Sequence, residues 1–119
     1  MTILVTGASG FVGGALVAAL ARRGASVRAM VRDKNRYTAP AGVDVVVADL
    51  RDAASLAPAV AGVAAVVHPA ALLGEFGQRS VFEDINVAGT RRLLDAARRA
   101  GVRRFVFVSS PSALMAPDG

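Results

Sequence analysis

Short runs of apolar, mostly β-branched residues alternate along the 119-residue chain with longer segments whose apolar residues recur at helical spacing. The short runs are nearly continuous rather than alternating with polar residues, which is typical of strands buried on both faces of a parallel sheet. They predict five strands, at residues 3–6, 26–31, 44–48, 64–68 and 105–109. The alternation of strand and helix signals therefore predicts an α/β domain.

Two of the segments between these strands carry strong helix signals. The first is expected to run from residue 10 or 11 to residue 23, because Gly24 is placed to form a left-handed C-terminal cap. The second is expected at residues 81–100, where Ser80 and Glu83 form a capping box of the S-x-x-E type. A further helix near residues 53–61 is expected to be short or distorted.

Residues within and beside this short helix determine where it starts and how long it is. Asp52 or Ser55 can cap its start, since both side chains accept hydrogen bonds from first-turn N–H groups. Pro58 has no N–H to donate, and it disfavours the helical conformation at Ala57. Both effects favour a short or distorted helix.

Right-handed crossovers between parallel strands most simply give strand order 3-2-1-4-5 with helices on both faces. The prediction is a Rossmann-type doubly wound parallel sheet of five strands that is truncated after the fifth. Residues 1–119 are expected to form one incomplete domain, because a chain of this length holds one core. Residues 111–119 mix Pro, Ala, Ser, Asp and Gly and are expected to be loop or disordered.

Composition narrows the function classes. The chain has no cysteine and one histidine, His68, which argues against disulfides and against a Cys- or His-ligated metal. The first residues lack a basic signal-peptide region, and no apolar run approaches the roughly 18 residues of a membrane helix. We expect a cytoplasmic protein with no membrane partner.

The charge balance does not indicate nucleic acid. The formal net charge is +5, but the basic residues are scattered in pairs, and only 5% of residues are aromatic. Three of the arginine pairs lie at or near expected helix ends, where cations complement the helix dipole. We interpret them as a solvated surface and expect no nucleic-acid partner.

The strongest motif is T-G-A-S-G-F-V-G at residues 6–13, directly after the first strand and at the start of the first helix. Gly7 allows a tight turn out of the strand, and Gly10 allows a pyrophosphate to approach the N–H groups at the helix N-terminus. Gly13 is expected to permit close packing of helix on sheet. The loop therefore predicts a site for a dinucleotide.

Other interpretations of this loop are weaker. Its glycines could serve only the turn between strand and helix, and a methyltransferase that binds S-adenosylmethionine can also place glycines after its first strand. A phosphate-binding P-loop does not fit, because Gly14 stands where that motif needs a lysine.

Five motifs in this order resemble the extended short-chain dehydrogenase/reductase family, which includes nucleotide-sugar epimerases, dehydratases and 3β-hydroxysteroid dehydrogenase-like enzymes. They are the glycine loop, Asp49-Leu50, V-V-H-P-A-A at 66–71, N-V-A-G-T at 86–90 and F-V-F-V-S-S at 105–110. The resemblance covers essentially the whole chain. It implies the NAD(P)-binding part of an oxidoreductase or epimerase; the alternative is a non-catalytic dinucleotide-binding or sensor module.

The resemblance also implies a role for individual residues. The Asp49 carboxylate would accept a hydrogen bond from the adenine amino group, the backbone of Leu50 would read the ring beside it, and Asn86 would lie at the nicotinamide end. Pro69 replaces a bulkier apolar residue, and His68 is interpreted as a structural, hydrogen-bonding residue. The cofactor-binding residues implied are Gly7, Ser9, Gly10, Phe11, Val12, Gly13, Arg32, Asp49, Leu50, Ala70, Ala71 and Asn86.

Catalysis in the family uses a Ser or Thr after the fifth strand and a Tyr-x-x-x-Lys on the following helix. Ser110 is the best match to the substrate-binding serine, with Ser109 as the register-shifted alternative. The single tyrosine and single lysine, Tyr37 and Lys34, lack the required spacing. We expect this chain to be inactive alone, as the N-terminal part of a longer enzyme. The S-S-P-S stretch at 109–112 favours the 3β-hydroxysteroid dehydrogenase-like branch.

The family resemblance also bears on which cofactor binds and on whether the chain forms a dimer. NAD-preferring relatives place an acidic residue where this chain has Val31, and Arg32 follows, which could pair with a 2′-phosphate. Asp33 opposes this as an acceptor for the ribose. NADP is therefore expected, with NAD as the alternative. Family dimers also imply a homodimer through residues 81–100.

Overall fold

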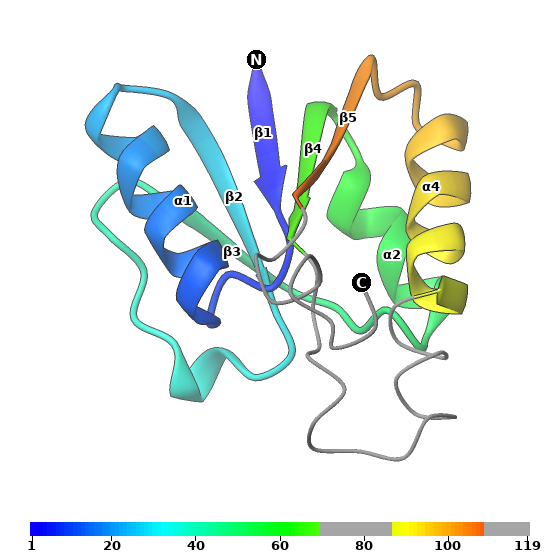
Figure 1. Cartoon of the computed structure of the whole chain (residues 1–119), viewed down its shortest axis with the longest axis horizontal. Helices are drawn as coiled ribbons and strands as arrows, with labels where there is room; N and C mark the ends of the chain where they lie inside the picture. Colours follow the sequence, from blue (N-terminus) through cyan, green and yellow to red (C-terminus); the bar gives the residue numbers. More distant parts are fainter. Residues whose placement is uncertain (70–86, 109–119) are drawn as a thin grey trace, which may run out of the picture.

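A computed structural model of the chain describes residues 1–69 and 87–108. Within these ranges five strands form one sheet, and helices pack against both of its faces (Figure 1). The strands are β1 (Thr2–Val5), β2 (Ser26–Val31), β3 (Asp44–Val47), β4 (Val63–Pro69) and β5 (Arg104–Val108). The helices are α1 (Phe11–Arg22), the 3₁₀ turn η1 (Lys34–Arg36), α2 (Ala53–Val60) and α4 (Gly89–Arg99).

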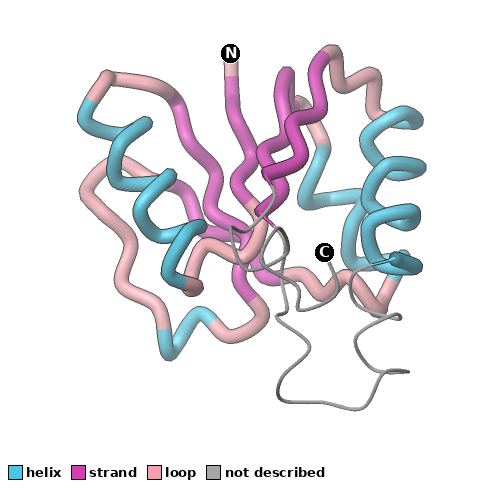
Figure 2. Tube along the Cα trace, viewed as in Figure 1, coloured by secondary structure: helices cyan, strands magenta, loops and turns pink. Residues whose placement is uncertain are grey.

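The sheet has the order β3-β2-β1-β4-β5, and every neighbouring pair is parallel. The predicted doubly wound topology is therefore confirmed, and Figure 2 shows the strands running side by side through the centre of the molecule. In register, Val5 of β1 pairs with Ala29 of β2 and Val67 of β4, and Val31 pairs with Val47. The carboxyl ends of β1, β2 and β3 consequently share one edge.

Alternate residues of β1 serve two separate cores. Val5 faces α1 and packs with Val17 of that helix, whereas Leu4 faces the opposite side and packs with α2 and α4. Figure 1 shows α1 on one side of the sheet and α2 with α4 on the other. The second core also contains Leu56 and Leu93, which are fully buried. Burial on both faces explains the continuous apolar runs of β1, β2 and β4. The expectation is wrong for the edge strands β3 and β5, which are mostly exposed because each has a neighbouring strand on one side alone among the described residues.

The element boundaries match the predictions closely. The helix near 53–61 is α2, and it is short, as expected, with Pro58 inside it. Asp52 is its cap, because its carboxylate accepts the Ala54 N–H at 3.1 Å. Ser55 instead lies in the first turn and bonds to the preceding loop.

The third predicted helix is described in part. α4 covers Gly89–Arg99, and Gly101 follows with φ +79°, the left-handed conformation expected after a helix end. The proposed start with Ser80 and Glu83 lies outside the described residues, as do residues 109–119. The homodimer through residues 81–100 stays a prediction. Within the described ranges, no helix has the length and apolarity needed to cross a membrane.

Candidate functional site

The glycine loop turns sharply at the carboxyl end of β1. Gly7 has φ +59°, a conformation that L side chains rarely adopt, so glycine is favoured there. Its carbonyl accepts the Gly10 N–H at 3.0 Å, and the Ala8 N–H donates to the carbonyl of Met30 at 3.1 Å. These bonds close the loop on itself and fix it to the end of β2.

Gly13 explains how closely α1 can approach this loop. A Cβ added at Gly13 would lie 2.0 Å from the carbonyl oxygen of Gly7 and 2.7 Å from its carbon. No side chain fits in that space. The sequence interpretation placed this contact between helix and sheet, whereas the structure places it between the helix and the backbone of the loop itself.

The N-terminus of α1 is open at the end of the loop. The N-cap, Gly10, supplies no side-chain hydrogen bond, and the first turn has no acidic residue. The N–H groups of Phe11, Val12 and Gly13 have no partner inside the helix, since first-turn donors lie before its first carbonyls. Ser9 and Gly10 are exposed, and so is the Phe11 side chain. The arrangement suits an anion.

Arg32 and Asp49 lie at the same edge, at the ends of β2 and β3. The Ala48 N–H donates to the Val31 carbonyl at 3.0 Å, so the two loops leave the sheet side by side. Arg32 is exposed. Asp33 caps the 3₁₀ turn η1, because its Oδ1 accepts the Asn35 N–H at 2.9 Å. One of its acceptor positions is therefore occupied.

The Asp49 carboxylate has a partner in its own turn. Arg51 donates from its backbone N–H to Oδ1 at 2.9 Å, from Nε to Oδ1 at 3.2 Å and from Nη2 to Oδ2 at 3.0 Å. The hydrogen bonds from the Arg51 side chain hold the pKa of Asp49 below its usual range, and the nearby Arg32 charge lowers it further. Asp49 is therefore ionised near neutral pH.

Leu50 is fixed from the opposite helix layer. Its side chain is buried, and its carbonyl accepts a hydrogen bond from Nη1 of Arg92 in α4 at 3.0 Å. The Leu50 N–H makes no hydrogen bond to the described residues. Sequence reasoning anticipated neither Arg51 nor Arg92. The D-L-R sequence offers a weak local signal for Arg51, and no signal pairs Arg92 with a residue 42 positions earlier.

His68 is buried under α4 and is hydrogen bonded on both sides of its ring. Its Nδ1 lies 2.6 Å from the Thr6 hydroxyl and its Nε2 lies 2.9 Å from the Thr90 hydroxyl. Burial lowers its pKa to about 4, so the ring is neutral and donates from one nitrogen while it accepts at the other. The geometry agrees with a structural, hydrogen-bonding role.

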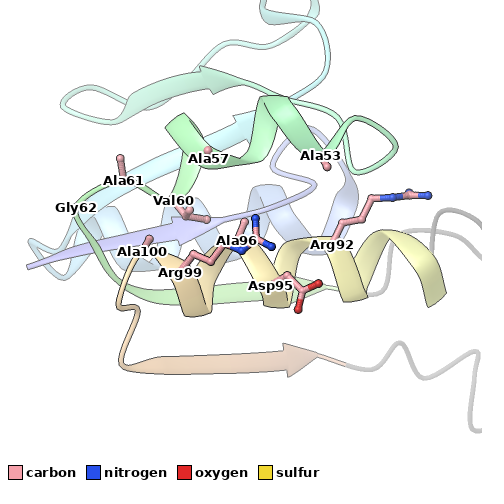
Figure 3. A pocket seen from close by; sticks show the side chains of 10 residues that line it. All are labelled: Ala53, Ala57, Val60, Ala61, Gly62, Arg92, Asp95, Ala96, Arg99 and Ala100. Carbon is pink, nitrogen blue, oxygen red and sulfur yellow. The ribbon is translucent and has the colours of Figure 1, made fainter.

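Four predicted site residues lie outside the described residues. They are Ala70, Ala71, Asn86 and Ser110. The remaining ones gather at the carboxyl edge of β1, β2 and β3. A separate hollow of about 550 Å³ lies between α2 and α4, and none of the predicted site residues lines it. In Figure 3, Arg92, Asp95 and Arg99 border it from α4, opposite the alanines of α2.

Comparisons with known proteins point to one family. The sequence matches the NAD dependent epimerase/dehydratase family over residues 3–119. It is 48% identical over 113 residues to sterol demethylase protein B of Methylococcus capsulatus, covering 92% of this chain and 34% of that protein. It is 39% identical over 120 residues to a 3-beta-hydroxysteroid dehydrogenase of Mycolicibacterium neoaurum, covering 95% and 33% respectively.

The chain is also similar to a solved structure of a dinucleotide-binding protein. A short-chain dehydrogenase/reductase superfamily protein from Agrobacterium tumefaciens, with bound NAD, is 46% identical and superposes with a TM-score of 0.73. The match covers 92% of this chain and 33% of that one. The chain thus spans about a third of the length of the curated relatives it matches.

Replacing Gly13 by alanine should destabilise the protein strongly. The new Cβ would overlap the Gly7 carbonyl, which is backbone and cannot rotate away, and overpacking of this severity costs about 3 kcal/mol or more. Gly14→Ala is the matched control, because its Cβ would lie 3.3 Å from the Ala8 carbonyl. There the better helix propensity of alanine, about 1 kcal/mol, offsets the tighter contact. Urea unfolding followed by circular dichroism measures both; equal stabilities would contradict the proposed contact.

Acid should weaken the fold through His68. The unfolded chain gains this proton near pH 6.5 and the folded chain only near pH 4, so stability falls as the pH drops through that interval. The loss is on the order of 3 kcal/mol for a shift of this size. Urea unfolding at several pH values, beside an NMR titration of this single histidine, measures it. His68→Asn should remove this part of the pH dependence; an unchanged slope would refute it.

Proposed function

The chain belongs to the NAD dependent epimerase/dehydratase family, and we propose that it binds the dinucleotide cofactor of an oxidoreductase or epimerase. The observation that carries this proposal is the glycine loop with the open N-terminus of α1 beside it. Gly7 forms the turn, and Gly13 allows the helix to pack against the loop. Gly10 is the N-cap of α1 and has no side chain that could cover the first-turn N–H groups.

These residues fit a pyrophosphate. The first-turn N–H groups at Phe11 and Val12 are donors without intrahelical partners, and the helix dipole favours an anion at this end. The first turn has no carboxylate to repel it. Exposed Ser9 and Gly10 leave the backbone accessible. In this proposal the loop holds the pyrophosphate through backbone groups, so its contribution depends on the loop conformation more than on side-chain chemistry.

The adenosine half would extend over the ends of β2 and β3. Asp49 is ionised and can accept from the adenine amino group, and the Leu50 N–H has no hydrogen-bond partner among the described residues. Arg32 supplies a positive charge beside them, and Asp33 already accepts one N–H. This favours NADP. The solved relative contains NAD, which has no 2′-phosphate. The proposal of NADP for this chain therefore rests on Arg32 alone.

The nicotinamide half remains a proposal from the family resemblance. Ala70 and Ala71 would pass beneath the cofactor, Asn86 would lie near the nicotinamide, and Ser110 would hydrogen bond the substrate. A nicotinamide held by these residues would supply or accept a hydride. We propose a sterol-like or related hydrophobic alcohol or ketone as the substrate class of the whole protein, because the S-S-P-S stretch and the two curated relatives agree in this direction.

Arg32→Ala should weaken NADP binding selectively. Loss of a hydrogen bond between a guanidinium and a phosphate costs about 1.5 to 3 kcal/mol, whereas NAD has no 2′-phosphate to lose. Calorimetric titration of the chain with each cofactor measures the difference. Arg22→Ala removes an exposed arginine from the far end of α1 and serves as the control. Equal weakening for both cofactors, or tighter NAD binding by the unmodified chain, would contradict the NADP assignment.

The 119-residue chain by itself should bind cofactor without turning over a substrate. Its single lysine, Lys34, begins η1, and its single tyrosine, Tyr37, directly follows η1. The two have no Y-x-x-x-K spacing, so the 119 residues do not contain the family's proton-transfer pair. Following nicotinamide absorbance with steroid alcohols and with nucleotide sugars tests this. Reduction that co-purifies with the chain and scales with its concentration would refute it.

A further inference from the structure

The acceptor capacity of Asp49 is almost fully used within its own turn. An ionised carboxylate offers about four lone-pair positions. Oδ1 accepts the backbone N–H and the Nε–H of Arg51, at 2.9 and 3.2 Å, and Oδ2 accepts Nη2–H at 3.0 Å. Among the described residues these are its hydrogen bonds, so one position remains, on Oδ2.

We propose that Arg51 is a positioning residue that makes the site selective for a 6-aminopurine, by holding the Asp49 carboxylate so that one Oδ2 lone pair faces the base. The inference rests on the proposed function and adds a specificity determinant to it. Arg51 itself need not touch the ligand. Its role is to fix the plane of the carboxylate, since two parallel N–H donors on a rigid guanidinium match both oxygens at once.

The backbone on both sides of this carboxylate is also fixed. The Asp49 N–H donates to the Ser55 hydroxyl at 3.0 Å, and the Asp49 carbonyl accepts the Asp52 N–H at 2.9 Å. The Leu50 carbonyl is held by Arg92 at 3.0 Å. An acceptor at Asp49 Oδ2 and a donor at the Leu50 N–H are therefore presented by consecutive, anchored residues.

That pattern distinguishes purine bases. The edge of adenine presents a 6-amino donor beside the N1 acceptor, which complements an acceptor followed by a donor. Hypoxanthine presents a 6-oxo acceptor beside an N1–H donor, so both contacts are reversed. A mobile carboxylate could rotate away from the oxo group and lose this discrimination, whereas a carboxylate held by Arg51 cannot.

A contribution to folding stability does not by itself explain the ion pair between Arg51 and Asp49. The Arg51 and Asp49 side chains are 51% and 32% exposed, and ion pairs in such surroundings contribute little to folding. Removing the Arg51 side chain should therefore leave the fold intact while freeing the Asp49 carboxylate, which would keep one N–H bond from the Arg51 backbone. The consequence is expected in base selectivity and not in thermal stability.

The test compares NAD with nicotinamide hypoxanthine dinucleotide, which lacks the 6-amino group. Both lack a 2′-phosphate, so any effect of Arg32 cancels in the ratio of their dissociation constants. Calorimetric titration of the chain should show that NAD binds roughly tenfold or more tightly, the size expected for a hydrogen bond to a charged group. In Arg51→Ala this ratio should fall at least about fivefold, towards one.

Three further variants interpret the result. Arg51→Lys keeps the charge without the fork and should also lose most of the selectivity, whereas Arg22→Ala should keep the parent ratio. Asp49→Ala gives the ratio of a site without the carboxylate. Urea midpoints of all variants should stay close to that of the parent chain, which excludes misfolding as the cause of a lost ratio.

Several results would overturn the inference in distinguishable ways. If Asp49→Ala loses the selectivity and Arg51→Ala retains it, or if Arg51→Ala weakens both dinucleotides equally, Arg51 does not position the carboxylate, and the proposed function stands. If the parent chain binds both dinucleotides equally, the inference is wrong and the proposed function stands. If it binds neither of them and also fails to bind NADP, the proposed function is wrong and the inference is wrong with it.

Discussion

The approach of α1 to the backbone of the preceding loop is the constraint from which the geometry of the site follows. Only a residue without a Cβ fits between helix and loop at Gly13, where the Gly7 carbonyl occupies the position a side chain would take. This contact, together with the bond from Ala8 to the end of β2, sets the direction in which the helix leaves the sheet. The open N-terminus of α1 consequently lies beside the loops that follow β2 and β3.

Parallel strand pairing concentrates the other polar groups at this same edge. Arg32 and Asp49 follow neighbouring strands whose ends are joined by the bond from Ala48 to Val31. Their charges interact, since Arg32 lowers the pKa of Asp49 in addition to the larger effect of Arg51. This edge therefore combines the positive end of the α1 dipole with a carboxylate that Arg51 holds and whose pKa both arginines lower.

Hydrogen bonds that are buried or partly buried connect the region under α4 to this edge. Thr6, which directly precedes Gly7, bonds to His68, and His68 bonds to Thr90 in the first turn of α4. Arg92, half a turn further along α4, bonds to the Leu50 carbonyl. Buried polar groups are costly when they are unpaired, so these contacts favour one placement of α4 relative to the glycine loop and the Asp49 turn.

The sequence determined by itself the elements, their order and the location of the loop. Continuous apolar runs locate the strands, although they overstate the burial of the edge strands β3 and β5. Right-handed crossovers between parallel strands favour the strand order that the structure has. Gly7 and Gly24 were also predictable, because a turn out of a strand and a helix end both favour positive φ. These properties are local, so short stretches of sequence carry them.

Only the tertiary structure decided which groups meet. The bonds from His68 to Thr6 and Thr90 join residues 62 and 22 positions apart, and the bond from Arg92 to Leu50 spans 42 positions. Periodicity gives the buried face of an element but not the side chain that lies opposite it. The contact between Gly13 and the Gly7 carbonyl, and the hydrogen bonds that the Asp49 carboxylate accepts, likewise depend on small differences in atomic position. Packing of the whole domain sets these positions.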